Sequence, residues 1–185
     1  MSILVTGGAR SGKSSFAERW MMANTDHAVY VATAQAFDQE MKDRIALHQQ
    51  QRNQAEFSWR TVEEPLRLPE LLQSWQSETK APAVLVDCLT LWLSNVILAV
   101  EGQKDMELRI REAIDKLVAS IKAYPGTLVL VTNEVGDGIV PEYALGRIFR
   151  DYAGILNQSV ARVCSQVFLV TVGIPIELKS REYRL

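Results

Sequence analysis

Near the start of the chain stand the residues Gly7-Gly8-Ala9-Arg10-Ser11-Gly12-Lys13-Ser14, the stretch that decides the fold. They match the complete pattern G-x-x-x-x-G-K-[ST] of a phosphate-binding loop, or P-loop. The apolar run 3–5 comes directly before this loop, and a helix-like segment, residues 15–22, follows it. This context matters because a strand must deliver the loop and a helix must leave it with its N-terminus aimed at the phosphates.

The residue types of the loop suit a nucleoside triphosphate and its metal ion. Gly7 and Gly12 allow positive φ angles and close backbone approach, so the loop's N–H groups can form a concave anion site. Lys13 can reach the β- and γ-phosphates, and Ser14 can ligate Mg²⁺. The alternative is a glycine-rich turn that only caps a helix, but strand, pattern and helix together favour a nucleotide. We therefore predict nucleotide contacts from Gly7, Gly8, Ala9, Arg10, Ser11, Gly12, Lys13 and Ser14.

Composition and charge limit the class of protein. Of the 185 residues, 48% are hydrophobic and 23% charged, which is typical of one globular domain with a sizeable core. The net charge of −2 gives no indication of a nucleic-acid partner. Cys88 and Cys164 lie in apolar segments without metal-site spacing, so we expect buried thiols in a reducing compartment.

No membrane span or leader is expected. Met1 is followed almost at once by a strand, which leaves no room for a signal peptide, and the apolar stretch 89–100 is too short to span a bilayer. That stretch is either a deeply buried helix or part of a subunit interface. We expect a cytoplasmic protein.

Strand-like and helix-like segments alternate along the chain. Apolar, β-branched runs typical of buried parallel strands lie at residues 3–6, 28–33, 83–87, 127–132 and 167–172. Helical periodicity marks residues 110–121 and 145–163, and a polar helix is expected over 39–51. The alternation predicts a single α/β domain, residues 1–185, whose mostly parallel central sheet is flanked by helices. Residues 51–82 are interpreted as an irregular excursion from it.

Two polar features follow predicted strands, at the edge where open α/β sheets bind ligands. Asp87 ends an apolar strand, and a carboxylate in that place reaches a magnesium ion beside a P-loop. Its alternative role is to cap the next helix. The glycine-punctuated loop 133–141 carries Glu134 and Asp137, and it is either functional or a solvated connector. Because the motif N-K-x-D is absent, a switch-type GTPase is not expected.

The chain has two histidines, His27 and His48. His27 precedes a strand and is interpreted as a turn residue. His48 lies on the predicted polar helix, with Arg44 and Arg52 one turn before and after it on the same face. It is either an ordinary surface residue or, beside two cations that can pair with phosphates, a nucleophile towards phosphorus.

These residues resemble the bifunctional adenosylcobinamide kinase and adenosylcobinamide-phosphate guanylyltransferase family of cobalamin assembly. The similarity runs nearly end to end. Residues 3–14 are generic to P-loop proteins. The later blocks are more specific, and they are Tyr30-Val31-Ala32-Thr33-Ala34, Arg44-Ile45 with His48 and Arg52, Trp59-Arg60-Thr61-Val62-Glu63-Glu64-Pro65, Val131-Thr132-Asn133-Glu134-Val135-Gly136 and Gly138-Ile139-Val140-Pro141.

The resemblance implies a RecA-like P-loop NTPase fold, usually a homotrimer. It implies ATP and GTP as substrates, Mg²⁺ on Ser14 and Asp87, and adenosylcobinamide and its phosphate as acceptors. In the family a histidine on the helix after the second strand is transiently guanylylated, and His48 matches that position. Relatives often carry a basic residue directly after it, where this chain has Gln49. The implied nucleotide contacts beyond the loop are Thr33, Ala34, Gln35, Gln49, Gln50, Gln51, Arg52, Glu63 and Asp87.

Lys13 and His48 are thus the predicted catalytic residues of two successive reactions. In the first, the cobinamide hydroxyl attacks the γ-phosphate, and Lys13, the loop amides and Mg²⁺ neutralise the developing charge. In the second, His48 takes GMP from GTP and passes it to adenosylcobinamide-phosphate, giving adenosylcobinamide-GDP. The alternatives are a small-molecule P-loop kinase without guanylyltransferase activity and a RecA-like nucleotide-dependent binding module.

Overall fold

The computed structural model describes residues 1–35 and 57–183. The strands of this part form one seven-stranded sheet in the order β3-β2-β4-β5-β1-β6-β7. Neighbouring strands are parallel except β6 and β7, which pair antiparallel. The strands are β1 (Ser2–Thr6), β2 (His27–Ala32), β3 (Ser58–Glu63), β4 (Val84–Asp87), β5 (Leu128–Val131), β6 (Gln166–Thr171) and β7 (Ile174–Glu177). The predicted mostly parallel sheet and its five apolar strands are confirmed.

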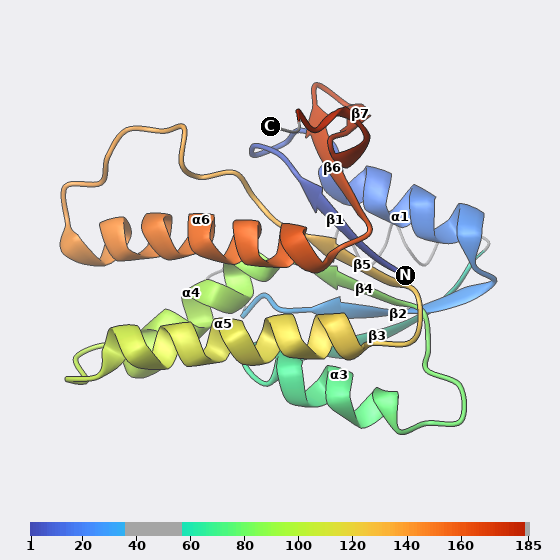
Figure 1. Cartoon of the computed structure of the whole chain (residues 1–185), viewed down its shortest axis with the longest axis horizontal. Coiled ribbons are helices and arrows are strands. Elements are labelled where there is room, and N and C mark those ends of the chain that lie inside the picture. The colour runs from blue at the N-terminus through green and yellow to red at the C-terminus, as the bar shows by residue number, and fades with distance from the viewer. Residues whose placement is uncertain (36–56, 184–185) are drawn as a thin grey trace.

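Helices cover both faces of the sheet (Figure 1). One face carries α1 (Lys13–Asn24), which leaves the P-loop. The opposite face carries α3 (Leu68–Gln76), α4 (Leu89–Val100), α5 (Met106–Ala123) and α6 (Ala144–Val163). A short 3-10 helix, η1 (Lys179–Arg181), follows β7.

The central strands contribute to two cores because successive side chains of a strand point to opposite faces. Leu4 and Leu130 belong to the core shared with α3 to α6, whereas Val5 and Val131 belong to the core beneath α1. All four are at most 1% exposed. Each such side chain contributes about 1.5–3 kcal/mol by burial, so both faces of a central strand must be apolar.

Residues 51–82 differ from the irregular excursion that the sequence indicated. In the described part of this stretch, β3 pairs with β2 from His27–Ser58 to Ala32–Glu63, and α3 packs beside α5. The strand is an edge strand with mostly exposed side chains, so it lacks the continuous apolar run of a buried strand. The helix begins with Leu68 and has Pro69 in its first turn, where proline is tolerated.

The apolar stretch 89–100 forms α4, which is mainly a core helix. Its side chains Leu89, Trp92 and Leu93 are fully buried, whereas Leu98 near its end is 47% exposed. Among the helices of the described residues, none is long and apolar enough to cross a bilayer.

Candidate functional site

The loop between β1 and α1 has the backbone that an anion site requires. Gly7 and Gly12 have φ angles of 157° and 93°, and Arg10 has one of 56°. A Cβ on Gly7 would stand 2.4 Å from the carbonyl oxygen of Val170, and one on Gly12 would stand 3.2 Å from the Cα of Gly173. Both positions therefore require glycine, because of their φ angles and because β6 and the turn after it approach so closely.

Hydrogen bonds hold the loop in this shape. The N–H of Ser11 donates to the carbonyl of Gly8 at 3.3 Å, and the N–H of Gly173 donates to the carbonyl of Ser11 at 2.8 Å. The turn between β6 and β7 thus supports the loop from outside. The concave side of the loop carries the N–H groups at the start of α1. These groups have no partner within the helix.

Lys13 lies across the loop as the first residue of α1. The residue is 9% exposed, and its Nζ donates a 3.1 Å hydrogen bond to the carbonyl of Gly8. Ser14 follows in the first helical turn, where the helix dipole favours negative charge. An ammonium group, a helix N-terminus and a concave backbone together form a site for a polyanion.

The C-terminal ends of the strands bring two carboxylates to the same side of the sheet. In the register, Glu63 pairs with Ala32, Ala32 with Asp87, and Asp87 with Val131. Paired residues of parallel strands share a face, and Ala32 and Val131 belong to the core beneath α1. Asp87 and Glu63 therefore face the side of the P-loop helix. From the strand spacing they lie about 10 Å apart, and β1 lies about as far from Asp87 on the other side.

The side chain of Asp87 is hydrogen-bonded to Tyr30 of the neighbouring strand β2 and does not cap α4. The Tyr30 hydroxyl donates a 3.1 Å hydrogen bond to Asp87 Oδ2. The N-cap residue of α4 is Cys88, and the helix has no side-chain cap. The capping alternative for Asp87 is therefore wrong. Asp87 and Ser14 both offer oxygen atoms, the ligands that Mg²⁺ takes from proteins beside substrate phosphates.

The pKa of the buried Cys88 thiol is affected by its burial and by the charges of the site. Burial raises the pKa of the Cys88 thiol to about 11, the negative charge of Asp87 adds to the rise, and the positive charge of Lys13 opposes it. Cys88 and Cys164 are both free and buried, as the sequence predicted, and their raised pKa values keep them as inert thiols.

Thr33 has a structural contact that the sequence did not indicate. Its hydroxyl donates to the carbonyl of Cys88 at 2.7 Å and accepts from the Cys88 N–H at 2.8 Å. The whole residue is buried, its N–H donates to the carbonyl of Asp87 at 3.3 Å, and its carbonyl accepts from Asn95 Nδ2 at 2.8 Å. These bonds hold Thr33 in the fold, and its contact with a nucleotide stays a prediction. Ala34 and Gln35 follow at the same edge and are partly exposed.

Comparison with known proteins agrees with this geometry. The family model described as cobinamide kinase / cobinamide phosphate guanyltransferase matches residues 3–178. The chain belongs to this family. The bifunctional adenosylcobalamin biosynthesis protein CobU of Escherichia coli K12 is 42% identical over an alignment of 187 positions, which covers 97% of this chain and 100% of the relative. The corresponding protein CobP of Pseudomonas aeruginosa is 45% identical over 181 residues, with 97% and 98% covered.

Solved structures resemble this cobinamide kinase family member in fold alone. An ATPase of the type III secretion system of pathogenic bacteria matches 100% of this chain and 58% of its own, with a TM-score of 0.54 and 12% identity. A protein of Pyrococcus horikoshii OT3 matches 95% of this chain and 84% of its own, with a TM-score of 0.51 and 10% identity. With the P-loop and the parallel sheet, the likeness confirms a RecA-like P-loop NTPase fold.

The predicted guanylylation site lies outside the described residues. This holds for His48 and Arg44, and for the proposed nucleotide contacts Gln49, Gln50, Gln51 and Arg52. Their roles stay predictions. Gln35, the last described residue before them, follows the C-terminal end of β2 at the edge that also carries Asp87.

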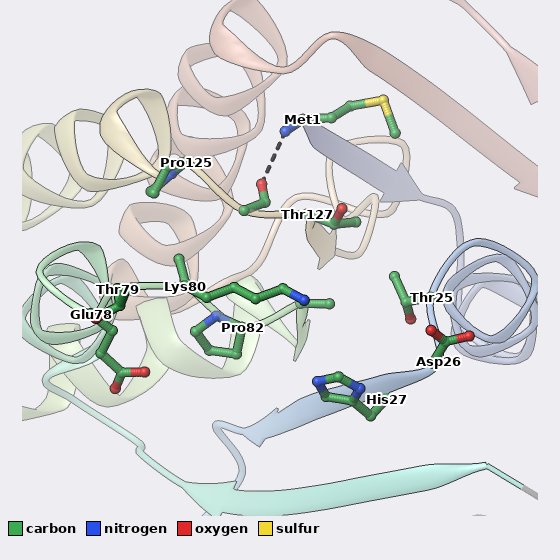
Figure 2. A pocket seen from close by; sticks show the side chains of 13 residues that line it. Met1, Thr25, Asp26, His27, Glu78, Thr79, Lys80, Pro82, Pro125 and Thr127 are labelled. Carbon is green, nitrogen blue, oxygen red and sulfur yellow. Dashed lines mark hydrogen bonds between the residues drawn. The ribbon is translucent and has the colours of Figure 1, made fainter.

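A cavity of about 720 Å³ lies at the opposite end of the sheet (Figure 2). Met1, His27, Lys80 and Thr127 are among its lining residues, and the Met1 ammonium donates a 2.9 Å hydrogen bond to the carbonyl of Gly126. His27 is the exposed first residue of β2, not a turn residue. None of the predicted site residues is among those that line this cavity, so His27 and Lys80 are suitable controls for His48 and Lys13.

In this cobinamide kinase family member, Thr6, Glu134 and Asn157 form a hydrogen-bonded group at the ligand edge that the sequence did not predict. The Thr6 hydroxyl donates to Glu134 Oε1 at 2.5 Å, and Asn157 Nδ2 donates to the same oxygen at 3.4 Å. The N–H of Glu134 donates to the carbonyl of Gly7 at 3.1 Å. The sequence indicated the loop 133–141 with its carboxylates Glu134 and Asp137, but not the contacts of Glu134 with Thr6 and Asn157. A half-buried amide on α6 signals that a polar partner is needed, but not which one.

Proposed function

We propose that this chain phosphorylates adenosylcobinamide with a nucleoside triphosphate. It then transfers GMP from GTP to adenosylcobinamide-phosphate, giving adenosylcobinamide-GDP. The observation that carries the proposal is the family match over residues 3–178 on a chain whose P-loop, Asp87 and Glu63 share one sheet edge. The relatives that span nearly the whole chain are themselves bifunctional adenosylcobalamin biosynthesis proteins.

In the kinase step the hydroxyl of adenosylcobinamide attacks the γ-phosphorus, and the nucleoside diphosphate leaves. Lys13, already held against the loop at Gly8, and the loop N–H groups stabilise the charge that develops on the phosphate oxygens. Ser14 and Asp87 would hold a magnesium ion, which would supply further charge neutralisation. The residues that align the triphosphate are those of the loop, Gly7 to Ser14.

In the transfer step the imidazole of His48 attacks the α-phosphorus of GTP. A phosphorus–nitrogen bond forms as pyrophosphate leaves, and the acceptor phosphate then breaks that bond and takes GMP. The P-loop holds the triphosphate and then the pyrophosphate, so one anion site serves both reactions. The nucleoside end is bound by Ala34 and Gln35, which follow the buried Thr33, by residues 49–52, and by Glu63, whose carboxylate accepts hydrogen bonds from hydroxyl or amino groups.

We also propose that the chain works as a homotrimer in the cytoplasm. Support for self-association comes from the edge strand β7 and the turn before it. Val172, Ile174 and Ile176 are 84%, 60% and 41% exposed there. Exposed apolar side chains on an unpaired strand edge favour burial against another protein surface. Light scattering behind a sizing column tests the trimer, and a monomer at micromolar concentration contradicts it.

Labelled GTP tests the two reactions separately. With GTP labelled at the α-phosphate we expect acid-labile, alkali-stable label on the protein, which adenosylcobinamide-phosphate then removes as adenosylcobinamide-GDP. With label at the γ-phosphate we expect labelled cobinamide and unlabelled protein. If the protein takes up no α-label during turnover, the covalent transfer route is wrong. Labelled adenosylcobinamide-GDP then indicates direct transfer of GMP, and its absence indicates a simple kinase.

A further inference from the structure

Glu134 lies in the loop that follows β5 (Leu128–Val131), the strand between the two that carry the phosphate site. In the sheet, β5 lies between β1, which leads into the P-loop, and β4, which ends at Asp87. Val131 of β5 pairs with both Val5 and Asp87. The hydrogen bond from the Glu134 N–H to the carbonyl of Gly7 puts Glu134 level with the first residue of the loop. A γ-phosphate bound by the loop on one side and by a metal ion at Asp87 on the other would lie in front of β5.

One oxygen of the Glu134 carboxylate, Oε1, is held by hydrogen bonds, and the residue is exposed to solvent. Thr6 and Asn157 both donate to Oε1, and neither of these hydrogen bonds uses Oε2. Asn157 is itself oriented, because its Oδ1 accepts from the Thr132 hydroxyl at 2.7 Å and its Nδ2 also donates to the carbonyl of Asn133 at 3.1 Å. Glu134 is nevertheless exposed. A held and accessible carboxylate beside a phosphate site is suited to accept a proton.

The other charged groups of this edge have different roles. Lys13 is a cation and cannot accept a proton, and the Asp87 carboxylate is the proposed metal ligand. Glu63 lies about 10 Å beyond Asp87, on the far side of β2. Asp137 is in the same loop as Glu134 but lies farther along the chain, in an exposed stretch. Among these charged groups of the described residues, Glu134 is therefore the one whose position suits the acceptor's hydroxyl.

We propose that Glu134 is the general base of the kinase step, with Thr6 and Asn157 as positioning residues. The proposal rests on the kinase reaction proposed above. As the acceptor's hydroxyl oxygen bonds to the γ-phosphorus, its proton passes to the Glu134 carboxylate. The bond from the γ-phosphorus to the bridging oxygen breaks, and the nucleoside diphosphate leaves with the electron pair. Glu134 then releases the proton to solvent.

Glu134→Gln tests this role without removing the contacts that hold the side chain. The amide oxygen of glutamine still accepts from Thr6 and Asn157, but it cannot take a proton. We expect kcat for phosphorylation of adenosylcobinamide to fall by about 100-fold or more, with KM for the nucleotide changed by less than about threefold. Protein labelling from α-labelled GTP should be unchanged. The matched control Asp137→Asn, in the same loop, should keep both activities.

Each other outcome overturns the assignment. If Glu134→Gln phosphorylates adenosylcobinamide at the unaltered chain's rate, Glu134 is not the base. If phosphorylation and α-labelling fall together, Glu134 only maintains the loop. If the unaltered chain fails to phosphorylate adenosylcobinamide at all, it is the proposed kinase function that is wrong, so the two failures are distinguishable.

The positioning role of Thr6 has its own test. Thr6→Val removes the hydroxyl and keeps the β-branched shape, so kcat for phosphorylation should fall by about tenfold with little change in KM. Thr6→Ser keeps the hydroxyl and should restore most of that loss. If the serine and valine variants are equally impaired, the hydrogen bond to Glu134 is not what matters at this position.

Discussion

Gly7 lies so close to Val170 that a Cβ on the glycine would stand 2.4 Å from the valine's carbonyl oxygen. Its φ angle of 157° is also one that L side chains rarely adopt. The first residue of the P-loop is thus packed against β6, a strand from the other end of the chain. The shape of the anion site depends on this packing as well as on the loop's own sequence.

Gly7→Ala should therefore damage stability and nucleotide binding together. Strain and the clash with Val170 should cost about 2 kcal/mol or more, and thermal denaturation and GTP titration measure the two effects. Gly8→Ala is the control for stability alone, because a Cβ on Gly8 meets nothing within 4 Å. Equal unfolding midpoints for the two variants would contradict the packing argument.

Lys13→Ala should impair both reactions, because the same ammonium group meets the γ-phosphate in one and the pyrophosphate in the other. We expect each rate to fall by about 100-fold or more, as removal of a group that stabilises developing charge does. Kinase assays and α-labelling measure the two rates. Lys80→Ala is the matched control at the opposite end of the sheet, where Lys80 lines the cavity of Figure 2, and it should keep both. A Lys13→Ala variant that loses one reaction only would show that the loop does not serve both.

The sequence predicts the strands that are buried on both faces and misses the two at the edges. Val129 and Leu130 are fully buried on opposite faces, so their strand must be a continuous apolar run. In β3, by contrast, Arg60 and Thr61 are exposed beside the half-buried Val62, because an edge strand has one hydrogen-bonded neighbour. In β7, Pro175 lacks an N–H, which only an edge tolerates.

Local pattern likewise predicts the loop of the site but not its long-range support. The P-loop is readable because eight consecutive residues carry the whole anion site. The group formed by Thr6, Glu134 and Asn157 joins residues 128 and 23 positions apart. No periodicity or spacing encodes such a contact, because it depends on which strands and helices become neighbours in the fold.

Glu177 anchors the end of the described chain, and its role depends on pH. Hydrogen bonds from Ser180, Val167 and Lys179 lower the pKa of Glu177 from its ordinary 4.5 to about 2. Because the folded value is the lower one, the stabilisation is fully present above pH 4.5 and is lost as the pH falls through 2. Glu177→Gln should lower the unfolding midpoint at neutral pH, and its difference from the unaltered chain should vanish towards pH 2. Glu101→Gln, at an exposed glutamate, is the control variant for the unfolding midpoint at neutral pH.

His48→Ala should separate the two activities, because only guanylyl transfer uses the imidazole. Transfer of GMP should fall by about 1,000-fold or more, since no other group would form the covalent intermediate, while phosphorylation should stay within about threefold. His27→Ala removes the chain's other histidine, which lies at the amino-terminal end of β2, and should label normally with α-labelled GTP. Adenosylcobinamide-GDP formed by His48→Ala at the unaltered rate would mean that the acceptor phosphate attacks GTP directly, in which case the P-loop still holds the pyrophosphate but no histidine carries GMP.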